Sequence, residues 1–203
     1  NITLNDIRYC SELGYKIKLL GNSEVSFNKS SKEEFFCSVE PWLIPKNYGL
    51  SNVSGVLNAV QVQSSLAGSV MITGAGAGGE PTASAVLADI VDFANRTKLL
   101  SFGRNSSKIK SNYKTNTYTE KFRFYLRLNV IDKSGVLASL TSIFRDNELS
   151  IESFIQKSNH EDKTAELVII THEASKSMLD KALLSINKLD GVISDPVCLS
   201  IYS

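Results

Sequence analysis

The sequence is poor in the features that mark membrane, nucleic-acid-binding and disulfide-rich proteins. It has no run of about 18 apolar residues, the length of a membrane-spanning helix, and no signal-peptide pattern. A net charge of +1 over 203 residues gives no reason to expect a nucleic acid or a membrane as partner. Cys10, Cys37 and Cys198 are widely spaced and form no CxxC motif, which indicates reduced, mostly buried thiols and a cytoplasmic protein. His160 and His172 have no partner at metal-ligand spacing, so no metal site is predicted.

The chain begins without a methionine and enters a helical pattern almost at once. Thr3 or Asn5 is a suitable N-cap and Gly14 a suitable C-terminal stop, so a helix is predicted over 4–13. The alternating stretch YKIKLL, at 15–20, predicts a strand. We therefore expect the sequence to start partway through a fold.

A region of mixed pattern follows. Residues 21–34 are polar and indicate a solvated turn, whereas residues 35–44 are rich in β-forming side chains. Pro41 would confine that second stretch to a sheet edge, a bulge or two short pieces. An α+β layer is the simplest arrangement, completed by two further apolar runs and a helix: 56–62, 69–73 and 81–96.

The stretch 74–94, GAGAGGEPTASAVLADIVDFA, is a glycine-rich turn that runs directly into the predicted helix. Pro81 suits a first helical position, where its missing N–H costs nothing. The free N–H groups of such a turn can hold an anion or a phosphate. One apolar stripe along the helix is expected to be buried: Ala83, Val86, Leu87, Ile90, Val91 and Ala94.

Gly74, Gly76 and Gly79 satisfy GxGxxG, the dinucleotide-binding fingerprint. A Rossmann domain would continue with a second parallel strand that ends in an acidic residue about twenty residues further on. Here Asp89 and Asp92 lie inside the predicted helix, where a solvated face is a simpler interpretation than a catalytic carboxylate pair. The bare motif is equally compatible with glycines that only allow two backbones to approach closely.

A second unit begins after a polar stretch at 99–121, which is interpreted as a linker. Residues 122–203 show the order βαββαβ, the ferredoxin-like arrangement. The first strand of this unit alternates apolar and polar side chains and is predicted to be half-buried. Its exposed face would carry Arg123, Arg127 and Asn129.

The turn DKSGVL, at 132–137, joins the first strand of this unit to its first helix. A glycine at this place lets the backbone approach a small ligand, and the N-terminus of the helix can hold a carboxylate. A simple tight turn is the alternative. The residues predicted to contact an effector are Asp132, Gly135, Val136 and Leu137.

Both parts of the chain resemble known families. ITGAGAGGEPTASAVLADIVDFANR, at 72–96, resembles a segment late in the catalytic part of homoserine dehydrogenases, and the resemblance covers 1–98 through SVEPWLI, GVLNAVQV and LGYKIKLLG. The unit at 122–203 resembles the ACT domain appended to many of these enzymes. The usual turn of that domain is DxPGVL, and here Ser134 replaces the proline.

The resemblance implies an NAD(P)-dependent oxidoreductase that interconverts L-aspartate 4-semialdehyde and L-homoserine, on the pathway to threonine and methionine. It implies an incomplete α/β-sheet substrate and dimerisation domain over 1–98, a linker over 99–121 and an ACT regulatory domain over 122–203. In this family the Rossmann domain and the catalytic lysine, within a GxDxxxK signature, come earlier than the part resembled here. The 203 residues contain neither, so no catalytic residue is assigned and the chain by itself is expected to be inactive.

The resemblance also implies partners. In this family the glycine turn reaches the nicotinamide cofactor, NADP or NAD, and this role maps to Gly78 with Gly76 and Ala77 beside it. A homodimer or higher homo-oligomer through the sheet and the ACT domains is expected, with an amino-acid effector for which threonine is the natural candidate. One alternative is a stand-alone amino-acid-sensing regulatory protein. An RNA-binding module shares the βαββαβ order, but the third strand, TAELVIITH, lacks the stacking aromatics that it needs.

Overall fold

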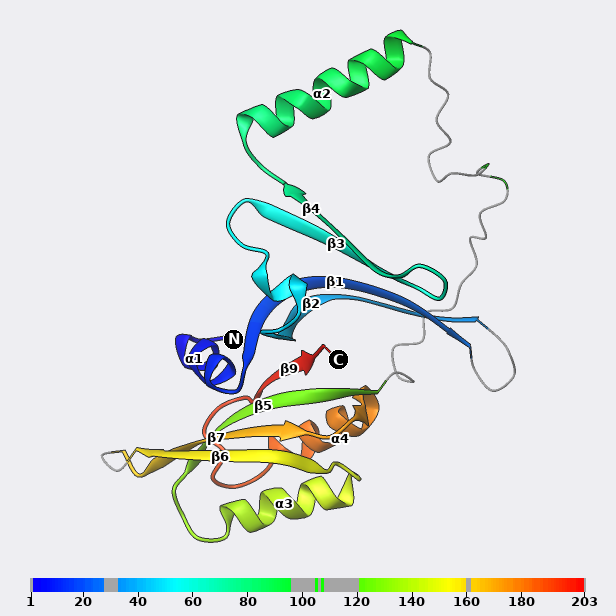
Figure 1. The fold of residues 1–203 in the computed structure, drawn as a ribbon. Helices are drawn as coiled ribbons and strands as arrows, with labels where there is room; N and C mark the ends of the chain where they lie inside the picture. Colours follow the sequence, from blue (N-terminus) through cyan, green and yellow to red (C-terminus); the bar gives the residue numbers. More distant parts are fainter. Residues whose placement is uncertain are drawn as a thin grey trace. The chain divides into compact units, whose positions relative to one another are not determined.

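The computed structural model describes residues 2–27, 33–95, 105, 107, 121–159 and 162–202. By contacts, the chain divides into two compact units, 1–46 with 114–203 and 47–113, and each is described by itself (Figure 1). This division differs from the domain boundaries expected from the sequence, 1–98 and 122–203. Those boundaries stay a prediction. The expected linker lies almost entirely outside the described residues. Within those residues, no helix is long and apolar enough to cross a membrane.

A seven-stranded sheet forms the first unit. Its strands are β1 (Tyr15–Phe27), β2 (Glu33–Pro45), β5 (Lys121–Ile131), β6 (Ile151–Asn159), β7 (Thr164–Thr171), β8 (Ala174–Ser175) and β9 (Val197–Ile201). The spatial order is β1-β2-β9-β5-β7-β6, with β8 paired to β5. In the described part of this unit, three helices accompany the sheet: α1 (Leu4–Glu12), α3 (Val136–Asp146) and α4 (Lys176–Ile186).

The predicted βαββαβ unit is confirmed as β5-α3-β6-β7-α4-β9, with the spatial order β9-β5-β7-β6. Helices α3 and α4 pack on one face of the sheet, where alternate side chains of β5 point. Phe124, Leu126 and Leu128 meet Phe144 of α3 and Leu179 of α4 in this core. The 3.6-residue and two-residue periodicities of the sequence are both satisfied by this layer.

The opposite face of the same sheet is covered by α1, the helix predicted at 4–13. Tyr9 and Cys10 of α1 pack against Tyr125 of β5 and Val168 of β7. The middle of strand β5, residues 124–128, is therefore buried on both faces, and the prediction of a half-buried strand is wrong there. Arg127, which was placed on an exposed face, is only 6% exposed. The cause is a helix more than a hundred residues earlier in the chain, which strand alternation cannot reveal.

Strands β1 and β2 form a long antiparallel hairpin that continues the sheet beyond β9. The strand predicted at 15–20 runs on to Phe27, so the turn predicted at 21–34 is wrong in its first part. Gly21 pairs with Val39 there, in a strand at the edge of the sheet where polar side chains stay in water. Strand β2 is continuous through Pro41. Among the described residues, its second side pairs with β9 at Trp42 and Leu43 and with no residue at Pro41, as the edge alternative requires.

The second unit contains a short 3-10 helix, η1 (Gly49–Asn52), the hairpin β3 (Leu57–Ser64) and β4 (Gly68–Ala75), and α2 (Gly79–Ala94). The predicted apolar runs and helix are confirmed as these elements. The predicted burial of the α2 stripe is wrong: Val86 is 53% exposed and Leu87 61%. Among the described residues, no side chain of α2 is buried. Because β3 and β4 are antiparallel, the glycine motif does not belong to a Rossmann unit in these elements.

Candidate functional site

The three residues predicted to contact a cofactor form the connection between β4 and α2. Gly78 is the N-cap of α2, with φ 126° and ψ 152°, a conformation that is essentially restricted to glycine. The backbone N–H of Gly76 donates to the carbonyl of Val56 at 2.8 Å. A Cβ at Gly76 would overlap the side-chain amide of Asn58. Backbone geometry therefore accounts for both glycines, and the turn, with Ala77 between them, is exposed.

The donors at the start of α2 are fewer than the glycine motif suggests. Pro81 has no N–H, and both the N–H and the hydroxyl of Thr82 donate to the carbonyl of Gly78, at 3.2 and 2.7 Å. Only the N–H groups of Gly79 and Glu80 in the first turn then lack an intrahelical acceptor. The exposed Glu80 carboxylate beside them opposes a bound anion. This geometry fits a backbone wall that lies against a ligand better than a complete phosphate cradle.

The predicted effector residues lie together on the exposed turn between β5 and α3. Gly135 is the N-cap of α3 with φ 96°, so the turn needs glycine at this position. The N–H of Asp132 donates to the carbonyl of Lys163 at 2.8 Å, which ties the turn to the β6–β7 connection. Val136 is partly buried, and Leu137 is 41% exposed. Their proximity follows from their being consecutive and is no independent sign of a site.

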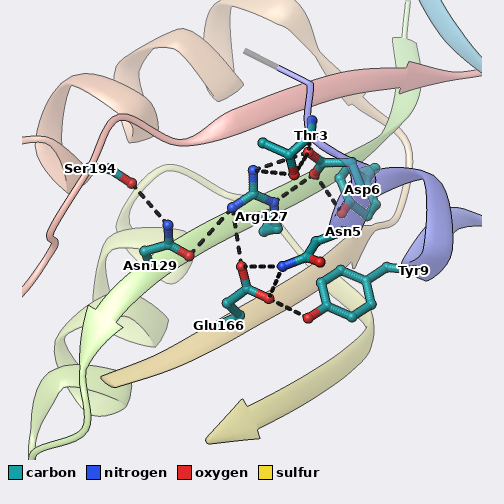
Figure 2. Close-up of polar contacts among 9 residues, drawn as sticks. Thr3, Asn5, Asp6, Tyr9, Arg127, Asn129, Glu166 and Ser194 are labelled. Atoms are coloured by element: carbon teal, nitrogen blue, oxygen red, sulfur yellow. Dashed lines mark hydrogen bonds and ion pairs between the residues drawn. The ribbon is translucent and has the colours of Figure 1, made fainter. Parts of the chain in front are cut away.

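A buried polar cluster between α1 and β5, shown in Figure 2, was not predicted. The guanidinium of Arg127 binds the Asp6 carboxylate through two hydrogen bonds, Nε to Oδ1 at 2.7 Å and Nη2 to Oδ2 at 3.0 Å. The Tyr125 hydroxyl donates to Asp6 Oδ1 at 3.0 Å. The backbone N–H and hydroxyl of Thr3 donate to Oδ2 at 2.7 and 2.8 Å. Asp6 is fully buried, so each of these donors offsets the loss of water around its charge.

A second carboxylate, that of Glu166 on β7, continues the cluster. It accepts hydrogen bonds from the Tyr9 hydroxyl and from the Asn5 side-chain amide, the latter at 3.3 Å to both oxygens. Nη1 of Arg127 lies 3.5 Å from Glu166 Oε1. The same Nη1 donates to Asn129 Oδ1 at 3.4 Å. The cluster thus joins α1 to two strands of the βαββαβ unit.

The protonation states follow from these contacts. Burial alone would raise the pKa of Asp6, but hydrogen bonds from Arg127 and Thr3 outweigh burial and hold this pKa below its usual value. Burial and the hydrogen bond to Glu166 raise the pKa of Tyr9 to about 12. At neutral pH the Asp6–Arg127 pair is therefore charged and Tyr9 is a hydrogen-bond donor.

Part of this cluster had a signal in the sequence. Thr3 and Asp6 stand at the spacing of a capping box, and the structure has the reciprocal bonds of that motif. The pairing of Asp6 with Arg127 had no such signal, because the two residues are 121 positions apart. In the described ranges, no group of three His, Cys, Asp or Glu residues comes together as metal ligands. All three cysteines are free thiols, and the expectation that they are mostly buried is wrong, because only Cys10 is buried while Cys37 is exposed and Cys198 is half-buried.

The fold defines a protein with a ferredoxin-like domain of the ACT type. Strands β1 and β2, from an earlier part of the chain, extend the sheet of this domain. Residues 1–91 match the family model described as homoserine dehydrogenase, and residues 124–191 match the ACT domain. Residues 1–91 therefore belong to the homoserine dehydrogenase family, and residues 124–191 belong to the ACT-domain family.

Individual relatives agree with this assignment. The chain is 36% identical over 195 residues to a homoserine dehydrogenase of Neisseria gonorrhoeae, covering 92% of this chain and 43% of that protein. It is 34% identical over 205 residues to a homoserine dehydrogenase of Pseudomonas aeruginosa, covering 97% and 45%. The crystal structure of a homoserine dehydrogenase from Thiobacillus denitrificans matches 100% of this chain and 46% of its own, with a TM-score of 0.83 and 32% identity. The chain thus spans a little under half the length of the relatives that it matches.

Proposed function

We propose that these residues are the C-terminal part of an NAD(P)-dependent homoserine dehydrogenase, a cytoplasmic enzyme that interconverts L-aspartate 4-semialdehyde and L-homoserine on the route to threonine and methionine. The observation that carries the proposal is the succession of two family matches in one chain, the dehydrogenase at 1–91 and the ACT domain at 124–191. The TM-score of 0.83 over the whole chain to a homoserine dehydrogenase supports it.

In this proposal the glycine turn is one wall of the cofactor site. NADP or NAD supplies the hydride chemistry when it is bound, and the residues of this chain only bind and orient it. Gly78 and Gly76, with Ala77 between them, would contact the cofactor through an exposed backbone that carries no bulky side chain. The 203 residues provide no proton-transferring lysine in a GxDxxxK context, so catalysis belongs to another part of the enzyme.

The remaining roles proposed for this part are assembly and regulation. The exposed apolar stripe of α2, from Val86 to Val91, supports a surface that is covered in a homodimer or higher homo-oligomer. The exposed turn at 132–137 supports contact with an amino-acid effector, for which threonine, the end product of the route, is the first choice. Ser134 in place of the usual proline leaves the turn its glycine and its exposed helix N-terminus.

The test is an assay of NADPH oxidation with L-aspartate 4-semialdehyde. The product of the complete reading frame is expected to be active, whereas the 203-residue chain alone is expected to show no turnover. Turnover by the 203-residue chain, or inactivity of the complete product with both NADPH and NADH, would contradict the proposal.

The second candidate is a stand-alone amino-acid-sensing protein, which the complete βαββαβ unit favours. The two candidates differ in the gene. An upstream strand–GxGxxG–helix unit followed by GxDxxxK supports the dehydrogenase, whereas a start codon directly before Asn1 supports the sensor.

A further inference from the structure

The side chain of Asn58 lies directly against the glycine turn that follows β4. Asn58 is on β3, where it stands opposite Gly74 in the antiparallel hairpin. A Cβ at Gly76 would overlap Nδ2 of Asn58 and would lie 2.6 Å from its Cγ. The Asn58 amide therefore occupies the space that any side chain at position 76 would need. The glycine at this position keeps the amide beside the backbone of the turn.

The Asn58 amide has unused hydrogen-bonding capacity. A side-chain amide has two N–H donors and one oxygen acceptor. Within the described part of the chain, this amide takes part in no hydrogen bond. By contrast, the amide of Gln61 on the same strand donates to Ser69 Oγ at 3.1 Å. Because Asn58 is exposed, its donors and its acceptor are available to a molecule that lies against the turn.

An apolar surface leads up to this amide along the hairpin. Alternate residues of a strand point to the same side, and so do residues that face each other in neighbouring strands. Asn58 therefore shares its side of the hairpin with Val60 and Ile72, which are 65% and 69% exposed. The other side carries Met71, which packs on Gly49 of η1. The side with Asn58 thus offers apolar area on which a planar ring can pack, with a polar group at its end.

This combination matches the nicotinamide end of the cofactor. Nicotinamide is a planar ring with one neutral polar substituent, a carboxamide, which has the same donors and acceptor as the side chain of Asn58. Two such amides can each donate one hydrogen bond to the other. A phosphate group, in contrast, only accepts hydrogen bonds when it is ionised, so it would leave the Asn58 oxygen without a donor.

We propose that Asn58 binds the carboxamide of the nicotinamide ring and holds the ring against the glycine turn. This inference rests on the proposed function, because it assigns a further residue to the cofactor site of that enzyme. Asn58 is then a cofactor-binding residue, and Gly76 is a positioning residue that acts through it. The requirement for glycine at position 76 has a physical reason in this arrangement, since a side chain there would displace the amide.

The experiment is calorimetric titration of the complete enzyme, the product of the full reading frame, with NADP⁺ or NAD⁺ and two analogues. In the 3-acetylpyridine analogue, a methyl group replaces the NH₂ of the carboxamide, so both N–H donors are lost. ADP-ribose, with a 2′-phosphate in the NADP series, lacks the ring altogether. The unchanged enzyme should bind the normal cofactor at least about tenfold more tightly than the acetylpyridine analogue, because the analogue leaves the Asn58 oxygen without a donor.

Three variants locate the contact. Asn58→Ala should weaken binding of the normal cofactor at least about tenfold and should remove most of its advantage over the acetylpyridine analogue. Its affinity for ADP-ribose should not change, because that ligand has no carboxamide. Gly76→Ala should reproduce both effects while Asn58 is still present, because its Cβ displaces the amide. Gln63→Ala is the matched control, an exposed amide at the far end of the same strand, and should bind all three ligands normally.

Thermal unfolding of each variant checks that the fold is kept, and Gly76→Ala serves as the second variant if Asn58→Ala is unstable. Two results would overturn the proposal: an unchanged preference for the normal cofactor in Asn58→Ala, and an equal loss of affinity for ADP-ribose. Either result, with normal cofactor binding by the unchanged enzyme, would leave the proposed function standing. A complete enzyme that binds neither NADP⁺ nor NAD⁺ would overturn the proposed function and this inference together.

Discussion

Helices α1 and α2 both precede the βαββαβ unit in the sequence, and their surroundings are opposite. Helix α1 packs its Tyr9 and Cys10 on a sheet and buries the charge of Asp6 completely. Helix α2 carries a longer apolar stripe, yet each of its described large apolar side chains is more than half exposed. An apolar stripe therefore indicates that a helix packs against something, but it does not indicate against what. Within the described residues, the stripe of α1 is packed on a sheet and that of α2 is exposed.

The two regions also differ in what determines their geometry. Around α1, side chains determine the geometry, through the cluster of Asp6, Arg127 and Glu166. Around the start of α2, the backbone determines it, through Gly78 at a φ of 126°. Substitutions in the α1 cluster are therefore expected to cost more stability than substitutions at Gly78 or on the exposed face of α2.

The largest effect is expected from Arg127→Met, which leaves the fully buried Asp6 carboxylate without its cation. Breaking a buried pair in this way costs ~3–5 kcal/mol of unfolding free energy. Urea denaturation followed by circular dichroism measures it. The matched control is Arg145→Met, since Arg145 is 74% exposed and pairs with its neighbour Asp146, a contact worth ~0–1 kcal/mol.

A double variant separates the two sources of that cost. If the loss comes from an uncompensated charge, Asp6→Asn in the Arg127→Met background should recover part of the stability. Equal unfolding free energies for Arg127→Met and Arg145→Met would show that the cluster does not fix α1, and the contrast between the helices would then have no energetic basis.

The exposure predicted for Arg127 is wrong because burial by a distant helix leaves no pattern in the nearby sequence. The βαββαβ order could be read because each element has its own period, as in the alternation of Phe124, Leu126 and Leu128. The same alternation assigned Arg127 to water, and nothing near it in the chain indicates the helix that covers it. A capping residue such as Thr3 can be predicted from its neighbours in the sequence. An ion pair between residues far apart in the sequence can be predicted only once the fold is known.

Two other positions show the same limit. The polar stretch after Leu20 lacks a strand signal, and its strand exists because it pairs with β2 along the hairpin. The glycine turn was located correctly from its spacing, but its hydrogen bonds were not. The bonds from Thr82 to Gly78 reduce the anion-binding capacity that the motif suggested.

The second-largest effect is expected from Gly78→Ala. A side chain at this φ and ψ is strained by ~1–3 kcal/mol, so the β4–α2 connection should change its conformation or lose stability. In the complete enzyme the Michaelis constant for the nicotinamide cofactor should rise. Gly79→Ala is the matched control, because a Cβ there meets no atom within 4 Å and its φ is not positive. Equal cofactor kinetics for the two variants would contradict a role for the Gly78 backbone.

A pH effect of intermediate size is expected at the α1 cluster. The pKa of Asp6 is lowered in the folded state, so its contribution to stability is complete above its ordinary value of 3.8 and is lost as the pH falls below it. The pKa of Tyr9 is raised to about 12 from 10.0, so its contribution is complete below pH 10 and is lost between pH 10 and 12.

Urea denaturation over both pH ranges measures these contributions. Asp6→Asn should flatten the acid limb and Tyr9→Phe the alkaline limb, each relative to the unchanged chain. Acid and alkaline limbs that keep their slopes in these variants would assign the pH dependence to other groups.

The smallest effect on stability is expected at α2. Leu87→Asp should change the unfolding free energy of the 203-residue chain by no more than about 0.5 kcal/mol, because the side chain is 61% exposed. Its effect should instead fall on association. If the stripe is the proposed oligomer surface, sedimentation velocity should show a weaker homo-oligomer for Leu87→Asp, with Asp89→Asn as the control on the same helix. A loss of stability comparable to that of Arg127→Met would mean that α2 is packed within the chain after all, and that the contrast between the two helices is false.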